Sequence, residues 1–87
     1  NKSTGPWSFI GGGLNNNITT GNQTFIGCGL SNFVFGHYGA VVGGNLNAAG
    51  GSAFVGGGQS NTATTSNSLV VGGRLNSVAN TYSAIPS

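Results

Sequence analysis

The chain has 87 residues, which allows one domain, and its formal net charge is +2 because Lys2 and Arg74 are present while Asp and Glu are missing. Average composition would give about 22 charged residues in a chain of this length. Without carboxylates there is no acid pair for catalysis and no usual ligand for Ca²⁺ or Mg²⁺, and two isolated cations make no basic patch for nucleic acid. We therefore predict no enzymatic activity, no metal, no cofactor and no nucleic-acid partner. No run of 18 apolar residues occurs, so we also expect no membrane insertion by this segment.

In chain order, residues 1–8 come first, and we interpret them as a lead-in or cap of the kind that solenoid ends require. Residues 9–85 then carry a repeat with two halves, and residues 86–87 are its truncated end. The first half is a small residue, an apolar residue, and Ile or Val followed by Gly. The second half reads Asn, any residue, and Ile, Val or Ala. The first residue is not Met and the last repeat is incomplete, which predicts a processed chain or a fragment of a longer one.

The spacing of the first half predicts a repeat architecture. Its aliphatic residues are 16, 16, 13, 16 and 14 positions apart when the residue before Gly is taken in each repeat, with Pro86 in place of Gly after the last of them, Ile85. Each half is too short and too rich in Gly for a helix, and β-branched residues dominate it, so we predict two short strands per repeat. Tight hairpins favour Asn-Gly between strands, and the chain contains no Asn-Gly pair. The pattern therefore predicts an all-β fold: a parallel β-solenoid, or β-roll, of about five coils, roughly 25 Å long at about 4.8 Å per coil.

Alternation of side chains along each strand separates inward from outward columns. The predicted inward core consists of one column from each half: Ile10, Ile26, Val42, Val55, Val71 and Ile85 from the first half, and Ile18, Val34, Ala49, Ala63 and Val78 from the second. The Asn of the second half also points inward, where stacked amides can form hydrogen bonds from coil to coil. We call this column the Asn ladder: Asn16, Asn32, Asn47, Asn61 and Asn76.

The residue before each first-half aliphatic residue faces outward by the same alternation. This outward column is apolar: Phe9, Phe25, Val41, Phe54, Val70 and Ala84. Its counterpart on the second strand is mostly polar: Asn17, Phe33, Ala48, Thr62 and Ser77. A continuous apolar stripe on a small protein usually marks an interface. We therefore predict that the stripe packs against the same stripe of other copies, with a trimer around a central axis as the expected closed arrangement.

Three further features carry less functional information. Cys28 stands where other repeats have Gly: Gly12, Gly44, Gly57 and Gly73. We expect it to fill a tight slot as a small apolar residue, with a bridge or a reactive thiol as the alternative. His37 lies beside Tyr38 in GHYG, and we expect a surface loop there, with a ligand or base as the alternative. The glycine runs lack the Gly-x-x-x-x-Gly-Lys pattern of a phosphate loop and are interpreted as corners.

The run TFIGCGLSNFVFG and its sister runs resemble the repeats of the YadA-like head of trimeric autotransporter adhesins, in which a small residue, any residue, an aliphatic residue and Gly recur about every seven positions. The resemblance covers almost the whole chain, but the period here is nearer 16 than 14, and Phe or Val replaces smaller residues. It implies a left-handed parallel β-roll with three chains to a rod, displayed on a cell surface. Related repeats are known in other long fibres, including viral ones.

The expected function is a non-enzymatic structural or adhesive segment of a trimeric fibre, extracellular, on a cell or virion surface, with other copies and a host surface or matrix ligand as partners. A self-assembling filament subunit, joined through coil ends or stripes without closing, is the alternative. NNITTG and NFVFG are also similar to the Asn-x-Val-x-Gly repeat of plant ice-binding β-rolls. The outward array that such binding would use is interrupted by apolar residues in its middle. Its members in chain order are Asn17, Thr19, Phe33, Phe35, Ala48, Thr62 and Thr64.

Overall fold

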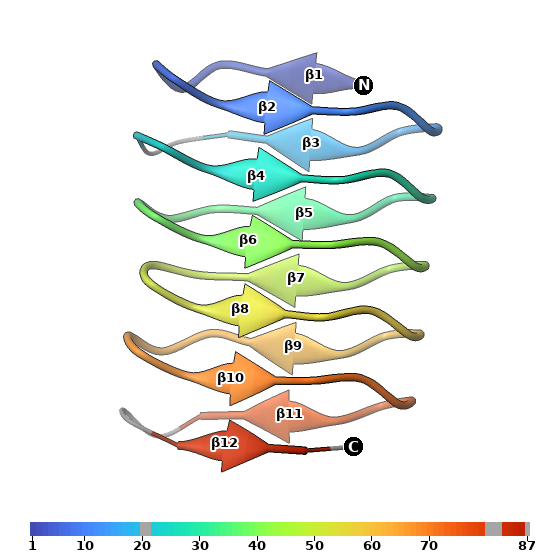
Figure 1. The fold of residues 1–87 in the computed structure, drawn as a ribbon, viewed down its shortest axis with the longest axis vertical. Helices are drawn as coiled ribbons and strands as arrows, with labels where there is room; N and C mark the ends of the chain where they lie inside the picture. Colours follow the sequence, from blue (N-terminus) through green and yellow to red (C-terminus); the bar gives the residue numbers. More distant parts are fainter. Residues whose placement is uncertain (20–21, 80–82, 87) are drawn as a thin grey trace.

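The computed structural model describes residues 1–19, 22–79 and 83–86. In this part of the chain, twelve strands of two residues each wind into a parallel β-solenoid of about five turns (Figure 1). Sheet A contains β1 (Lys2–Ser3), β3 (Asn17–Ile18), β5 (Phe33–Val34), β7 (Ala48–Ala49), β9 (Thr62–Ala63) and β11 (Ser77–Val78). Sheet B contains β2 (Phe9–Ile10), β4 (Phe25–Ile26), β6 (Ala40–Val41), β8 (Phe54–Val55), β10 (Leu69–Val70) and β12 (Ala84–Ile85). The predicted all-β solenoid with two short strands per coil is confirmed.

The coils stack along the longest dimension of a flat rod that measures 27 × 21 × 12 Å (Figure 1). This length agrees with the roughly 25 Å that the coil spacing predicts. Residues 1–8, expected as a lead-in or cap, contain β1, whose residues Lys2 and Ser3 pair with Asn17 and Ile18 of β3. This segment therefore supplies the first strand of sheet A.

The path from sheet B to sheet A has a constant length. Eight residues separate the inward aliphatic residue of sheet B from that of sheet A in every coil, as from Ile10 to Ile18 and from Val55 to Ala63. The return path from sheet A to sheet B takes eight residues from Ile18 to Ile26 and only six from Ala49 to Val55. The return connection therefore absorbs all the variation in the period of the repeat.

The corner from sheet B to sheet A depends on one glycine per coil with positive φ. These glycines are Gly13, Gly29, Gly44, Gly58 and Gly73, with φ between 91° and 118°. At Gly44 a Cβ atom would lie 2.2 Å from the carbonyl oxygen of Gly58 in the next coil. The backbone conformation and the close approach of the coils therefore both exclude a side chain here.

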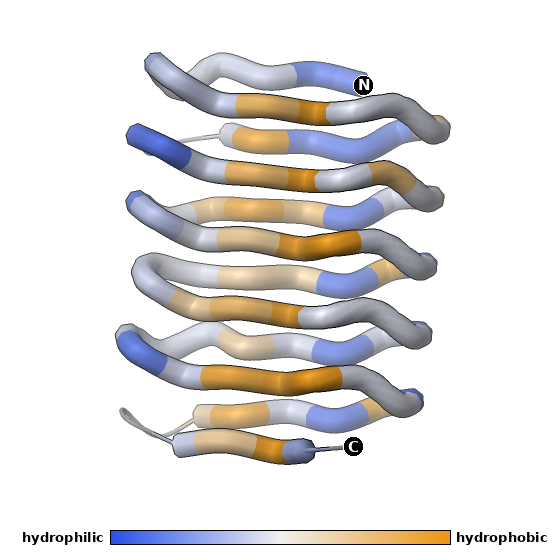
Figure 2. The backbone as a smooth tube through the Cα atoms, viewed as in Figure 1, coloured by the Kyte–Doolittle hydropathy of each residue, from blue (hydrophilic) through white to orange (hydrophobic). Residues whose placement is uncertain are grey.

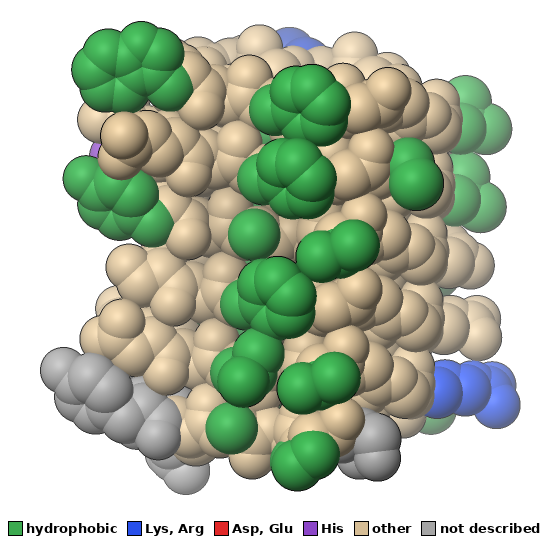
Figure 3. All heavy atoms as spheres, in the orientation of Figure 1, with side chains coloured by type: hydrophobic (Ala, Val, Ile, Leu, Met, Phe, Trp, Pro, Cys, Tyr) green, Lys and Arg blue, Asp and Glu red, His purple; other side chains and the backbone are tan. Residues whose placement is uncertain are grey.

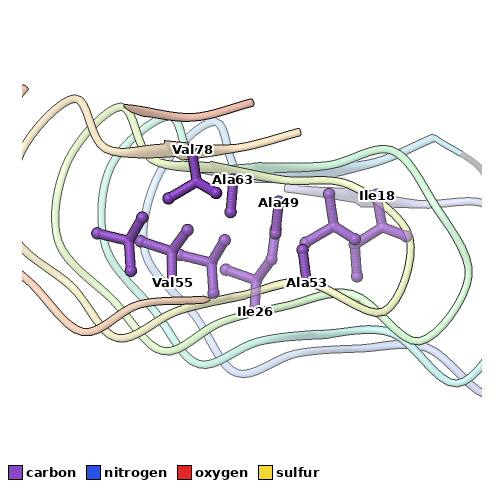
Figure 4. Close-up of a cluster of buried hydrophobic side chains, with 10 residues drawn as sticks. Ile18, Ile26, Ala49, Ala53, Val55, Ala63 and Val78 are labelled. Carbon is purple, nitrogen blue, oxygen red and sulfur yellow. The ribbon is translucent and has the colours of Figure 1, made fainter. Parts of the chain in front are cut away.

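The core consists of two facing columns between the sheets (Figure 4). Sheet A contributes one buried aliphatic residue per coil: Ile18, Val34, Ala49, Ala63 and Val78. Sheet B contributes the facing column: Ile26, Val41, Val55 and Val70, with Ile10 and Ile85 partly buried at the two ends. Small residues such as Thr24, Ala53 and Ser68 complete the interior beside the sheet B column.

Two coils of sheet B differ from the sequence prediction. Val42 and Val71, expected in the core, are 45% and 51% exposed, whereas Val41 and Val70, expected on the outer face, are fully buried. The reason is the strand register: Val41 pairs with Ile26 and Val70 with Val55, so the second Val of each Val-Val pair lies one position beyond the core column. A shift of one residue exchanges the two faces of a strand.

The Asn ladder is buried, with Asn76 partly exposed. Asn47 shows the arrangement: its Nδ2 donates to the carbonyl oxygens of Gly43 (2.9 Å) and Gly58 (3.0 Å), and its Oδ1 accepts the backbone N–H of Asn61 (2.9 Å). The ladder is therefore built from side-chain to backbone bonds rather than from bonds between neighbouring amides. Asn1 extends it, since its Oδ1 accepts the backbone N–H of Asn16 at 3.0 Å, and here a bond between two amides is added, because the same Oδ1 also accepts Nδ2 of Asn16 at 3.2 Å.

Candidate functional site: the outer face of sheet B

The outer face of sheet B carries one column of apolar side chains along the whole rod (Figure 3). The register of the parallel strands aligns its members: Phe9, Phe25, Ala40, Phe54, Leu69 and Ala84. We call this the Phe column. Its three Phe side chains are between 38% and 53% exposed, and Figure 2 shows hydrophobic segments on the front strands of every coil. Ala40 and Leu69 hold the places that the sequence analysis assigned to Val41 and Val70.

Each Phe of the column lies over a glycine two residues further along the chain. A Cβ atom on Gly11 would be 3.1 Å from Cε1 of Phe9, and the same relation joins Gly27 to Phe25 at 3.3 Å and Gly56 to Phe54 at 3.4 Å. In the remaining coils the column residue is not aromatic and a larger residue replaces the glycine: Ala40 with Val42, Leu69 with Val71, and Ala84 with Pro86. Every coil therefore has an apolar side chain in the Phe column, and the coils without an aromatic residue there have a second one two residues further along the chain.

This exchange of volume keeps the face apolar in every coil. The rings of Phe9 and Phe25 stack with centroids 5.3 Å apart and planes 9° from parallel. Val42 and Val71 are exposed beside the column, in coils where it is occupied by Ala40 and Leu69. The outer face of sheet B is thus a broad apolar surface, wider than the single stripe that the sequence predicted.

A constant spacing in the sequence could have placed these residues correctly. Six positions separate the inward aliphatic residue from the ladder Asn in every coil, as in Ile26 with Asn32 and Val41 with Asn47. Val42 stands only five positions before Asn47, and Val71 stands five before the next Asn. Alignment on this spacing, rather than on the Gly that follows the aliphatic residue, gives the observed column.

The outer face of sheet A is mixed in character. Its column follows the predicted order: Lys2, Asn17, Phe33, Ala48, Thr62 and Ser77. Phe33 and Phe35 interrupt the polar array, and their rings stack with centroids 5.4 Å apart. The regular Thr surface that ice binding would need is therefore broken in the middle of the rod, as the sequence indicates.

Cys28 is exposed, so the expectation that it fills a tight slot is wrong. Its backbone carbonyl accepts Nδ2 of Asn32 at 3.1 Å, as the carbonyl of Gly43 accepts Nδ2 of Asn47, so it is equivalent to Gly43 rather than to Gly44. A Cβ atom at the equivalent Gly72 would meet nothing within 4 Å. This corner position is open, and a side chain enters it without rearrangement.

His37 lies exposed in the return connection between β5 and β6. Its Nδ1 accepts the backbone N–H of Asn22 at 3.0 Å, and its ring is tilted against that of Tyr38 with centroids 6.3 Å apart. His37 is thus placed on the surface, where it ties together the return connections of two successive coils.

No protein-family model matches the chain, and no curated protein or solved structure is significantly similar to it. The part of the chain that the structure describes holds no helix with the length and apolar character needed to cross a membrane. No pocket is found among the same residues.

Proposed function

We propose that the chain is a non-enzymatic structural or adhesive segment of an extracellular fibre, on a cell or virion surface, in which three copies associate through the outer faces of sheet B. The observation that supports this most directly is the apolar face of sheet B, which continues through all six strands of the sheet. The resemblance of the repeats to the YadA-like head of trimeric autotransporter adhesins supports three chains with left-handed coils.

Burial of this face would contribute strongly to association. Full burial of an exposed Phe side chain contributes about 1.5–3 kcal/mol, and because these three side chains are already about half buried, each gains roughly half of that on association. No charge opposes the approach of another copy along the face, because Lys2 belongs to sheet A and Arg74 lies in the corner between the sheets. The many glycines lose much backbone entropy on folding, so a chain of this size gains from burial against its own copies.

Three flat solenoids around a common axis can direct every Phe column toward that axis. Sheet A then faces outward with Asn17, Thr62 and Ser77, which suit contact with water. The Phe33 and Phe35 pair on the same outward sheet offers an apolar contact for a host-surface or matrix ligand. The stacked coils, joined by the buried Asn ladder, supply the stiffness that a fibre segment needs.

The mass of the protein in solution tests this proposal. Phe25→Asp or Phe54→Asp places a carboxylate in the middle of the shared apolar surface, so we expect the trimer to separate into monomers of 8.5 kDa with an unchanged far-UV CD spectrum. Light scattering coupled to gel filtration measures the mass. Phe54→Ser is the milder variant to use where Asp disturbs folding.

Ser77→Asp is the matched control, because Ser77 is exposed on the opposite sheet, and it should remain a trimer. A wild-type protein that is monomeric at all concentrations would contradict the proposal. Open-ended polymers would favour the self-assembling filament in its place.

A further inference from the structure

A second apolar surface lies at the corner between sheet B and sheet A. Each corner carries two neighbouring residues, of which the first forms a bridge to its equivalents along the rod and the second has positive φ. In four of the five corners one of these two residues is an exposed Leu, between 42% and 69% exposed. These residues form what we call the Leu corner: Leu14, Leu30, Leu46 and Leu75.

Leu46 and Leu75 are exposed and also have a backbone conformation that is costly for Leu. Their φ angles are 58° and 60°, a left-handed conformation that costs roughly 1–2 kcal/mol for a residue with a Cβ atom. Hydrogen bonds hold the backbone there, since the N–H of Leu46 donates to the carbonyl of Leu30 at 2.9 Å. Ser31 and Ser60 occupy the same place in other coils. An exposed Leu in this conformation gives the single chain little stability, whereas burial against another surface would offset the cost.

The Leu corner follows the apolar face of sheet B along the chain. Val42 and Val71 are exposed between the Phe column and the corner in the chain. Figure 3 shows apolar side chains at the right-hand edge of this face in the upper coils, whereas polar and cationic side chains form that edge in the lower coils. Arg74 is the one cationic side chain at this corner, and the chain has no acid to oppose or pair with it. Each chain therefore offers a flat apolar face and an apolar edge that meets it at an angle.

We propose that the Leu corner of one copy packs against the sheet B face of the next copy, so that the contact between chains is heterologous; this inference rests on the proposed function. A two-fold contact would join face to face and would leave Leu46 and Leu75 in water. A corner-to-face contact uses both apolar surfaces of every chain, and it closes into a ring when successive copies are rotated by a third of a turn.

A mixing experiment distinguishes the two kinds of contact. One variant, Phe54→Asp, has a damaged face and an intact corner, and the second, Leu46→Asp with Leu75→Asp, has a damaged corner and an intact face. Asp tolerates the left-handed backbone better than Leu does, so the second variant should keep its fold. A heterologous contact predicts that each variant alone is a monomer, and that an equal mixture forms a pair with twice the 8.5 kDa chain mass, measured by native mass spectrometry.

Ser52→Asp with Asn67→Asp is the matched control, because these exposed residues share the left-handed backbone conformation of Leu46 and Leu75 but lie in the return connections from sheet A to sheet B, away from the Leu corner, and this variant should remain a trimer. A mixture that forms no pair would show a face-to-face contact and overturn the inference. A corner variant that stays trimeric, while Phe54→Asp is monomeric, would overturn the inference and leave the proposed function standing. Failure of Phe54→Asp to dissociate would instead contradict the proposed function itself.

Discussion

Replacement of Asn47 by Ala should lower the free energy of unfolding by at least about 2 kcal/mol, because three backbone groups lose a bond to its side chain: two of them lose their partner at about 1–3 kcal/mol each, and the Gly58 carbonyl keeps only the N–H of Asn45. These groups are the carbonyls of Gly43 and Gly58 and the N–H of Asn61, and the Asn47 side chain that joins them has no exposed surface. A loss of this size is a large part of the roughly 5–15 kcal/mol that stabilises a typical domain. Urea denaturation followed by CD at one fixed protein concentration measures it.

Asn47→Asp separates hydrogen bonding from volume. The carboxylate has almost the same shape as the amide but cannot donate to the two carbonyls, and its charge would be buried without a cation. We expect it to be at least as destabilising as Asn47→Ala at neutral pH. Gln59→Ala is the control, because it removes an exposed amide and should change stability by less than about 0.5 kcal/mol. If Asn47→Ala lost less than about 1 kcal/mol, the ladder would not stabilise the solenoid as we argue.

Gly44→Ala is the second substitution with a large expected effect. The backbone of Gly44 has φ +92°, and the new Cβ atom would lie 2.2 Å from the carbonyl oxygen of Gly58 and 2.7 Å from Nδ2 of Asn47. The methyl group would therefore strain the corner, separate two coils and disturb a ladder residue at the same time. We expect a loss of about 3 kcal/mol or more, with left-handed strain and overpacking each costing about 1–3 kcal/mol.

The adjacent Gly43 provides a matched control for this substitution. A Cβ atom there would lie 3.6 Å from the carbonyl oxygen of Cys28, an ordinary van der Waals distance, and the equivalent position in the second coil already carries the Cys28 side chain. Gly43→Ala should therefore change the midpoint of thermal unfolding by only a few degrees, whereas Gly44→Ala should lower it sharply or prevent folding. Equal effects of the two substitutions would contradict our account of the corner.

The repeat pattern of the sequence predicted the solenoid correctly. A two-half repeat with Gly between the strands excludes helices and hairpins, and the alternation in Asn-x-Ile and Asn-x-Val leaves one orientation for the second strand, since only one of its faces carries aliphatic residues throughout. Asn32, Asn47 and Asn61 are in the interior, and Phe9, Phe25 and Phe54 point outward. In each of these cases the two faces of the strand differ strongly in character, so the local sequence alone decides which face is buried.

The Val-Val pairs could not be assigned in that way. By local pattern either Val of the pair at 41–42 satisfies the core equally well, and the pairing of Val41 with Ile26, which the six-position spacing to the ladder Asn reflects, decides which one is buried. The exposure of Cys28 likewise depends on an open corner position that becomes visible only when the coils are stacked. The sequence by itself determined the coil, the Asn ladder and the apolar character of one sheet. The tertiary structure decided the register of the Val pairs and the alignment of the Phe column and the Leu corner along the rod, because hydrogen bonds between coils, rather than local preference, align one turn on the next.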